Sequence, residues 1–192
     1  MPKNAPRVET KRLTRDDWEN AALSVIAEGG LAALSVESLA RRLGVTKGSF
    51  YWHFADRTAL LVSALDRWQL RYTDAVIEFL ASETDPRKRL EYLVTGTDAS
   101  DKAWRVHVAL STSAHDPVVA AALARVSKQR IGYVESCFRA LGLPKGEARH
   151  RAVLAYTAHL GFLHLKVEAP AELPQGKSRN GYFRAVFTSL LP

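Results

Sequence analysis

Cysteine is nearly absent from the 192-residue sequence, which has a single thiol, Cys137. One cysteine excludes an internal disulfide framework and a zinc site built from several thiolates. The sequence also lacks the run of about 18 or more apolar residues that a membrane-spanning helix needs. Its first residues contain no apolar segment typical of a secretory signal. We therefore expect a cytoplasmic protein without membrane contact.

Sequence signatures of common enzymes are missing as well. There is no Gly-x-Ser-x-Gly nucleophile elbow, no P-loop and no glycine-rich dinucleotide fingerprint. Cys137 lies on an apolar stripe, where a cysteine is ordinarily a small buried side chain. The histidines of the second half show no i, i+4 metal spacing: His107, His115, His150, His159 and His164. We expect no catalysis, metal or cofactor, and an enzyme that pairs Cys137 with a distant histidine is the disfavoured alternative.

What the sequence does contain is a globular composition with a basic beginning. Apolar residues make up 47% of the chain and charged residues 24%, close to the averages of folded domains. The formal net charge is +7. Within residues 1–15, Glu9 is outnumbered by basic side chains at Lys3, Arg7, Lys11, Arg12 and Arg15. We expect residues 1–13 to form a flexible basic arm that favours a polyanion, with a merely solvated tail as the open alternative.

The periodicity of apolar residues is helical throughout and predicts an all-α protein. Thr14 is expected to cap a first helix that ends at Gly29-Gly30. Ser35 is expected to cap a second helix that ends at Gly44, and Thr46 a third, short one. Further helices are predicted at about 56–82, 86–97, 101–113, 117–141, 145–168 and 179–190.

Residues 35–61 carry the pattern of a helix-turn-helix. A helix, a tight turn at Gly44-Val45 and a short second helix follow one another. Such a unit needs apolar side chains between its helices, and the sequence supplies Val36, Leu39, Leu43, Val45, Phe50 and Phe54. At about 100° per residue, Phe50 and Phe54 share the buried side of the short helix.

The opposite side of the short helix is suited to DNA. Gly48, Ser49 and Trp52 point outward there, flanked by Lys47, Tyr51 and His53, and no carboxylate lies on this helix. A major groove rewards hydrogen-bond donors and repels carboxylates. We predict base-edge or mixed contacts from Lys47, Ser49 and Tyr51. Phosphate contacts are predicted from Thr46, Trp52, His53 and Arg57.

Residues 14–61 resemble the DNA-binding domain of the TetR family of bacterial transcriptional regulators. The resemblance is carried by AALSVIAEGG, LSVESLARRLGV and TKGSFYWHFADRTALL. It implies a three-helix helix-turn-helix domain at 14–57 and a helical ligand-binding and dimerisation domain at 58–192, with a homodimer as the active form.

The resemblance also implies roles for single residues. Tyr51 and His53 fall on the family's Tyr-x-His positions, which are associated with base and phosphate contact. Lys47 and Ser49 fall on other contact positions. Arg57 stands where the family commonly has lysine, so the geometry of a phosphate contact there would differ.

Two features of the second domain are open to interpretation. Helix 145–168 is apolar on much of its circumference, so we predict that it and the last helix form a dimer interface through Ala152, Leu154, Ala158, Phe162, Leu165, Phe183 and Phe187. Amphipathic residues suggest an effector pocket lined by Trp68, Tyr72, Trp104, His107, Tyr156 and His159. For each of these six residues, an ordinary core position is the alternative.

Taken together, the sequence predicts a homodimeric regulator that binds double-stranded DNA at a palindromic operator. We expect repression that an unidentified small molecule relieves. Control by a protein partner and activation instead of repression stay open as alternatives.

Overall fold

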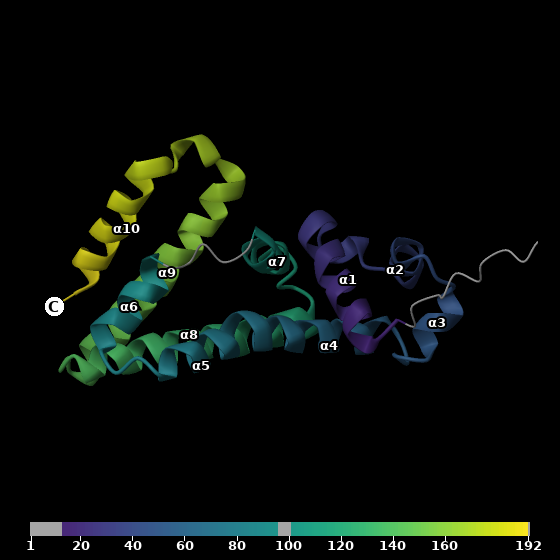
Figure 1. The fold of residues 1–192 in the computed structure, drawn as a ribbon, viewed down its shortest axis with the longest axis horizontal. Coiled ribbons are helices and arrows are strands. Elements are labelled where there is room, and N and C mark those ends of the chain that lie inside the picture. The colour runs from purple at the N-terminus through teal and green to yellow at the C-terminus, as the bar shows by residue number, and fades with distance from the viewer. Residues whose placement is uncertain (1–12, 96–100, 192) are drawn as a thin grey trace, which may run out of the picture.

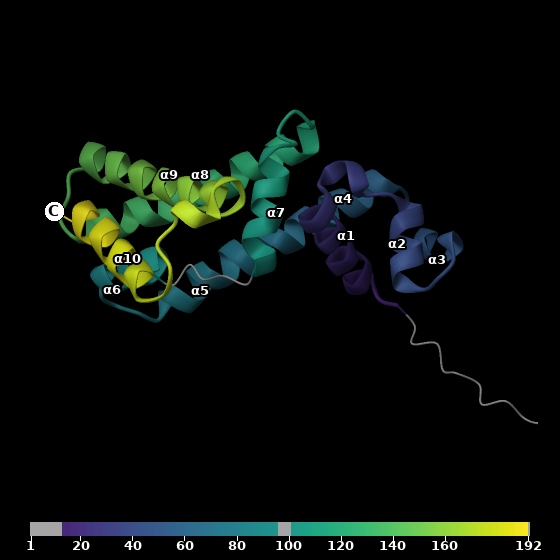
Figure 2. The same cartoon turned by 90° about the horizontal axis from the view of Figure 1, so that it is seen from above.

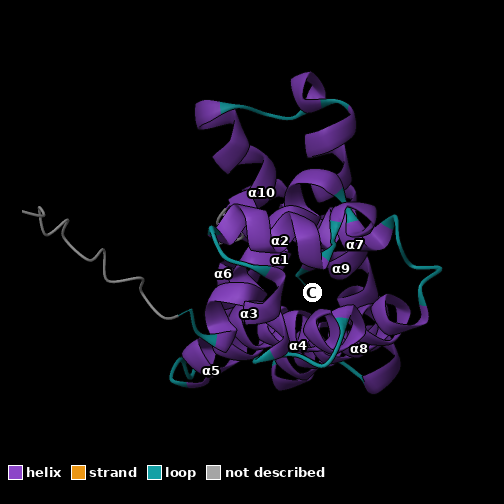
Figure 3. Cartoon of the chain, turned by 90° about the vertical axis from the view of Figure 1, so that its right-hand side faces the viewer, coloured by secondary structure: helices purple, strands orange, loops and turns teal. Residues whose placement is uncertain are grey.

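The computed structural model describes residues 13–95 and 101–191, and these residues form helices joined by turns, with no strand among them (Figure 3). The predicted all-α class is confirmed. Residues 1–12 of the expected basic arm lie outside the described residues. The helices form an elongated molecule with α1, α2 and α3 at one end and α6, α9 and α10 at the other (Figure 1).

The first three helices form a small bundle, which we call the head: α1 (Arg15–Gly29), α2 (Val36–Leu43) and α3 (Lys47–Tyr51). Thr14 and Ser35 cap α1 and α2 as predicted, each within a reciprocal capping box. Thr46 precedes α3, but its side chain makes no capping hydrogen bond, so that detail of the prediction is wrong. Gly44 adopts a left-handed φ of 70°, which lets α2 end and the chain turn at once into α3.

A long linker helix connects the head to the rest of the chain. It runs through α4 (Arg57–Gln69), a π-helical turn at Leu70–Asp74 and α5 (Ala75–Ala81). This span matches the single helix predicted at 56–82. The periodicity did not predict the π-helical turn, which is the kind of local irregularity often found at functional sites.

The remaining helices form the body, which consists of α6 (Pro86–Thr95), α7 (Asp101–Ser111), α8 (Pro117–Ala140), α9 (Lys145–Glu168) and α10 (Gly176–Leu190). Helix α8 packs along α9 and also against α4, while α10 packs on α6 (Figure 2). Helix α7 packs against α1 of the head. Helix α10 begins three residues before its predicted start, and residues 96–97 of the helix predicted at 86–97 lie outside the described part of the chain.

One apolar core runs from the head into the body. Trp18 and Phe50 are fully buried in the head, with their ring centroids 5.4 Å apart in an edge-on arrangement. The same cluster includes Val106 of α7 and Val126 of α8. Because these side chains share one core, a displacement of α7 or α8 changes the surroundings of the head.

Two further findings concern the expected position of Cys137 and the possibility of a membrane-spanning helix. Cys137 is buried, and burial raises the pKa of its thiol, which disfavours the reactive thiolate. None of the helices in the described ranges combines the length and the apolar character needed to cross a membrane.

The predicted dimer residues do not share one surface, and this corrects the sequence analysis. Ala152, Phe162, Phe183 and Phe187 are buried in the core of their own chain. Leu154 and Leu165 are exposed, while Ala158 is half-buried. Periodicity shows that a helix has apolar residues on several sides, but it does not show which side faces the same chain.

A buried ion-pair network joins α1 to α4. Glu19 of α1 is buried, and its carboxylate accepts hydrogen bonds from Arg67 Nε at 2.6 Å and from the Ser63 hydroxyl. Arg67 also pairs with Asp16, and these two carboxylates raise the pKa of Arg67. The head is thereby fixed to the first half of the linker helix.

We expect Arg67→Met to lower the free energy of unfolding by about 2–3 kcal/mol, because it removes the nearer of the two arginines that pair with the buried Glu19 carboxylate and leaves only Arg15, at 3.3 Å. The loss stays below that of a fully buried pair since Arg67 is partly exposed. Urea unfolding measures it, with Arg41→Met as the control at an exposed arginine of α2. Adding Glu19→Gln should restore part of the stability. Equal stability of the Arg67 and Arg41 variants would contradict the prediction.

Candidate DNA-binding helix and effector cavity

The outer face of α3 is the most exposed aromatic surface of the head. The side chains of Tyr51 and Trp52 are 62% and 88% exposed, although both are large apolar groups. Phe50 and Phe54 are buried on the opposite side, as predicted. Helix α3 lies at the end of the molecule farthest from the body, where nothing in the described chain covers its outer face (Figures 1 and 2). The geometry leaves this face free to approach a duplex.

Arg15 fixes the end of α3 against the helices behind it. Its guanidinium lies 4.3 Å from the centroid of the Phe54 ring and donates to the carbonyl oxygen of His53 at 3.1 Å. It also donates to the hydroxyl of Ser63 on α4 at 3.0 Å. Sequence reasoning missed this role because Arg15 was grouped with the basic arm by its charge alone. Arg15 therefore belongs to the support of the DNA-binding helix.

The side chain of Arg57 is bonded within the head, and this corrects the predicted phosphate contact. Its Nε donates to the carbonyl oxygen of Leu34 at 2.7 Å, and its Nη2 donates to that of Leu31 at 3.1 Å. These carbonyls belong to the turn between α1 and α2, which includes a short 3₁₀ helix, Leu31–Ala33. The forked donors of arginine suit this double contact. Arg57 is thus engaged inside the head rather than held out toward a phosphate.

Lys47 has an acidic partner that the sequence analysis did not anticipate. Its ammonium group is paired with Glu37 of α2, and this contact lowers the pKa of Glu37. The outer face of α3 therefore has a carboxylate beside it, although α3 carries none. The DNA contact predicted for Lys47 would require its ammonium group to exchange Glu37 for a phosphate or a base. The other predicted contact residues differ in exposure: Thr46 and Gly48 are exposed, while Ser49 and His53 are half-buried.

A cavity of about 340 Å³ lies in the body, between the linker helix and helices α6 to α10. Its volume is at the lower end of the range of small-molecule sites. Five of the six predicted pocket residues line it: Tyr72, Trp104, His107, Tyr156 and His159. Trp68 does not, which corrects the prediction. Its side chain is buried in the core that continues from the head, with its ring centroid 5.8 Å from that of His107.

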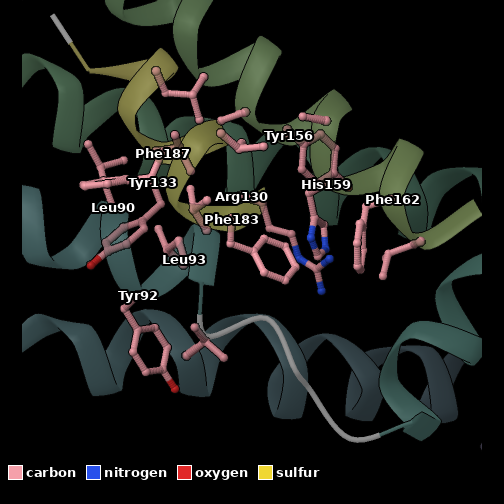
Figure 4. A pocket seen from close by; sticks show the side chains of 18 of the residues that line it. Leu90, Tyr92, Leu93, Arg130, Tyr133, Tyr156, His159, Phe162, Phe183 and Phe187 are labelled. Carbon is pink, nitrogen blue, oxygen red and sulfur yellow. The ribbon is translucent and has the colours of Figure 1, made fainter. Parts of the chain in front are cut away.

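Arg130 of α8 is the cavity residue that sequence reasoning missed. It is half-buried, and its guanidinium lies beside the imidazole of His159 (Figure 4). Arg130 stands four residues after the buried Val126 and seven before the buried Cys137, so it falls on the inward side of α8. That register was the available signal. A charged side chain on a buried stripe is a marker of a site or of an internal ion pair.

The histidines of the cavity are neutral at pH 7. Burial, with the positive charge of Arg130 nearby, lowers the pKa of His107 to about 3 and that of His159 to about 4. The Nδ1 atom of His107 is buried and has no hydrogen-bond partner among the described residues, and the same is true of the Tyr133 hydroxyl. Buried polar atoms are ordinarily satisfied, so these two are open to a ligand.

Arg130 also connects the cavity to the linker helix. Its Nε donates to the hydroxyl of Thr73 at 2.9 Å, and its Nη2 donates to the carbonyl oxygen of Tyr72 at 3.1 Å. Both acceptors lie in the π-helical turn. The neighbouring Gln129 donates to Asp74 at 2.6 Å and accepts from Gln69 at 2.9 Å. Hydrogen bonds therefore connect the polar end of the cavity directly to the π-helical turn of the linker helix.

Comparison with known proteins gives this geometry its context. A family model described as bacterial regulatory proteins, tetR family, matches residues 20–64. The transcriptional regulator BetI of Proteus mirabilis is 26% identical over 182 residues, which is 90% of this chain and 90% of that protein. The part matched by the family model includes α2, α3 and the surface formed by Tyr51 and Trp52.

Solved structures share the fold of the whole chain. A transcriptional regulator of Saccharomonospora viridis in complex with choline has a TM-score of 0.69 and 18% identity, covering 91% of this chain and 93% of that one. The regulator FadR of Bacillus subtilis in complex with stearoyl-CoA has a TM-score of 0.68 and 14% identity, covering 93% and 98%. The helix-turn-helix, the family match within it and the shared architecture lead to one conclusion. Residues 20–64 carry the DNA-binding region of the tetR family of bacterial regulatory proteins, and the chain is a DNA-binding transcriptional regulator.

Proposed function

We propose that this protein is a homodimeric repressor that a small molecule releases from a palindromic operator. The observation that carries the proposal is the position of the π-helical turn. Tyr72 and Thr73 of this turn line the cavity, and the same continuous helix begins at the back of the head. A ligand in the cavity thus contacts the element that carries the DNA-binding helices.

The release mechanism follows from the geometry of two joined heads. A dimer that reads two half-sites must present its recognition helices about 34–36 Å apart, or a multiple of that distance. A small rotation of α4 changes this separation, because the head is bonded to α4 through Glu19 and Arg67. A ligand that favours the rotated state lowers operator affinity by its preference for that state.

We take residues 14–57 as the DNA-binding domain and residues 58–192 as the ligand-binding and dimerisation domain of the cytoplasmic regulator. The cavity favours a small molecule over a protein partner as the controlling signal, because a protein cannot occupy an internal space of about 340 Å³. Tyr51 is the residue that we expect to read base edges, with support from Lys47 and Ser49.

The dimer surface that we propose lies on α9. Its exposed large apolar residues are Val153, Leu154, Leu165 and Val167, of which Leu154 and Leu165 share one side of the helix. Spacings of seven and four residues place Leu154, Gly161 and Leu165 near one line along the helix. Exposed apolar side chains grouped on a long helix mark an association surface. The polar outer side of α10 is not part of this surface, since the apolar residues of α10 face inward.

Tyr51→Ala should weaken binding to an operator selected from a random duplex library by roughly 1–3 kcal/mol, while binding to random duplex changes little. Phe79→Ala is the matched control, because Phe79 on α5 is 61% exposed and far along the chain from the head. Fluorescence anisotropy at two salt concentrations separates the specific from the ionic contribution. Equal losses on both duplexes would show that Tyr51 contacts the backbone and does not read bases.

Leu154→Glu should convert a dimer into a monomer at micromolar concentration, since it places a charge in an apolar contact between two chains. Leu154 is 57% exposed in the single chain, so the substitution leaves folding intact. Sedimentation equilibrium measures the mass, with Phe79→Glu as the control at an exposed apolar residue of another helix. A wild-type monomer, or a variant that stays dimeric, would rule out this dimer surface.

A further inference from the structure

The walls of the cavity are apolar over most of their extent. Leu90, Leu93, Phe162, Phe183 and Phe187 line it from α6, α9 and α10 (Figure 4). Burial of apolar surface favours any ligand with a hydrocarbon body. At about 30 Å³ for each water-sized group, a volume of about 340 Å³ accommodates a ligand of roughly eleven such groups.

The polar groups of the cavity gather around Arg130. His159 is its neighbour in Figure 4, and His107 lines the same cavity. Two of the five N–H groups of Arg130 donate to Thr73 and Tyr72, so donors remain for other partners. The Tyr156 hydroxyl, which is 3.0 Å from the Ser127 hydroxyl, lies near enough to Arg130 to favour its charged form.

The charge of Arg130 has no counter-charge in the cavity. Among the described residues that line it there is no aspartate and no glutamate, and no carboxylate of the described chain lies within ion-pair distance of Arg130. The other titratable groups that affect the two histidines are basic as well, namely His164 and Lys166. A guanidinium stays protonated even where burial lowers its pKa. A positive charge that is largely withdrawn from water and has no counter-charge is costly, and an anionic ligand lowers that cost.

We propose that the effector is an amphipathic anion, a carboxylate on an apolar body of medium length, and that Arg130 binds the carboxylate. This inference rests on the proposed effector site and names its ligand class. It separates this chain from its fold neighbour that contains choline, because a quaternary ammonium ion would face the guanidinium of Arg130. The unpartnered Nδ1 of His107 and hydroxyl of Tyr133 supply further polar contacts.

The same contact explains how such a ligand acts on the linker helix. A carboxylate at Arg130 attracts the guanidinium that now donates to Thr73 and Tyr72. Charge-assisted hydrogen bonds are about twice as strong as those to neutral acceptors, so the carboxylate competes well with both oxygens. The π-helical turn then loses contacts that hold it against α8.

Calorimetric titration of the full-length protein tests the charge preference with three probes that share an eight-carbon chain. Octanoate should bind, octan-1-ol should bind about tenfold to a hundredfold more weakly, and octyltrimethylammonium should not bind measurably. Equal affinity of octanoate and octan-1-ol would overturn the inference. So would tighter binding of the ammonium probe, or no binding of octanoate.

Variants on α8 assign the preference to one residue. Arg130→Met should abolish the advantage of octanoate over octan-1-ol, while Arg130→Lys, which keeps the charge, should retain it at lower affinity. Arg139→Met is the control at an exposed arginine of the same helix and should bind octanoate like the wild type. Circular dichroism confirms folding of each variant. An octanoate preference that survives in Arg130→Met would overturn the assignment.

Operator release is measured separately, so that the two proposals fail in different ways. If octanoate binds with the expected preference but leaves operator affinity unchanged, the ligand class stands and release by this site is wrong. If octan-1-ol and octanoate bind equally and both release the operator, the repressor mechanism stands and the anionic ligand class is wrong.

Discussion

The body of this protein depends on a half-buried arginine with no carboxylate of the described chain beside it. Arg130 donates to the π-helical turn of the linker helix and at the same time sets the charge of the cavity. Its positive charge adds to burial in keeping His107 and His159 neutral. Neutral histidines leave Arg130 as the one fixed charge among the described lining residues. In the proposals made above, the class of ligand and the transmission of its effect to the head therefore depend on the same side chain.

In the head, arginine side chains connect one helix to another by donating to backbone carbonyl oxygens, to a hydroxyl or to carboxylates. Arg15 links α1, the end of α3 and α4, while Arg57 links α4 to the turn after α1. Arg67 links α4 to α1 through two carboxylates. A small three-helix bundle buries little apolar surface, so such directed contacts fix the orientation of α3. The aromatic pair Tyr51 and Trp52 is presented by that fixed frame.

The sequence predicted the head well because its signals are local. The caps at Thr14 and Ser35, the Gly44 turn and the spacing of Phe50 and Phe54 are determined within a few residues, and the structure confirms these. The predicted cap at Thr46 is wrong. The roles of Arg15 and Arg130 were missed and that of Arg57 was misjudged, because charge says nothing of the distant carbonyl or hydroxyl that a long side chain reaches. The dimer residues failed for a related reason. Phe183 and Phe187 face the core of their own chain, a fact that depends on how α10 packs on α6.

If a ligand in the cavity is to move the head, one half of the linker helix must move rigidly with the head and the other half must change conformation. The first half, α4, is bonded to α1 by Glu19 and Arg67 and so moves with the head. The yielding element is the π-helical turn, where backbone hydrogen bonds depart from the regular helical pattern and Arg130 adds contacts from α8. A regular helix at this place would resist a local change in backbone conformation along its whole length. The π-helical turn is held by donors of Arg130, so its conformation responds when Arg130 donates to a stronger acceptor. In the mechanism that we propose, the irregularity is therefore where a charge in the cavity acts on the separation of two DNA-binding helices.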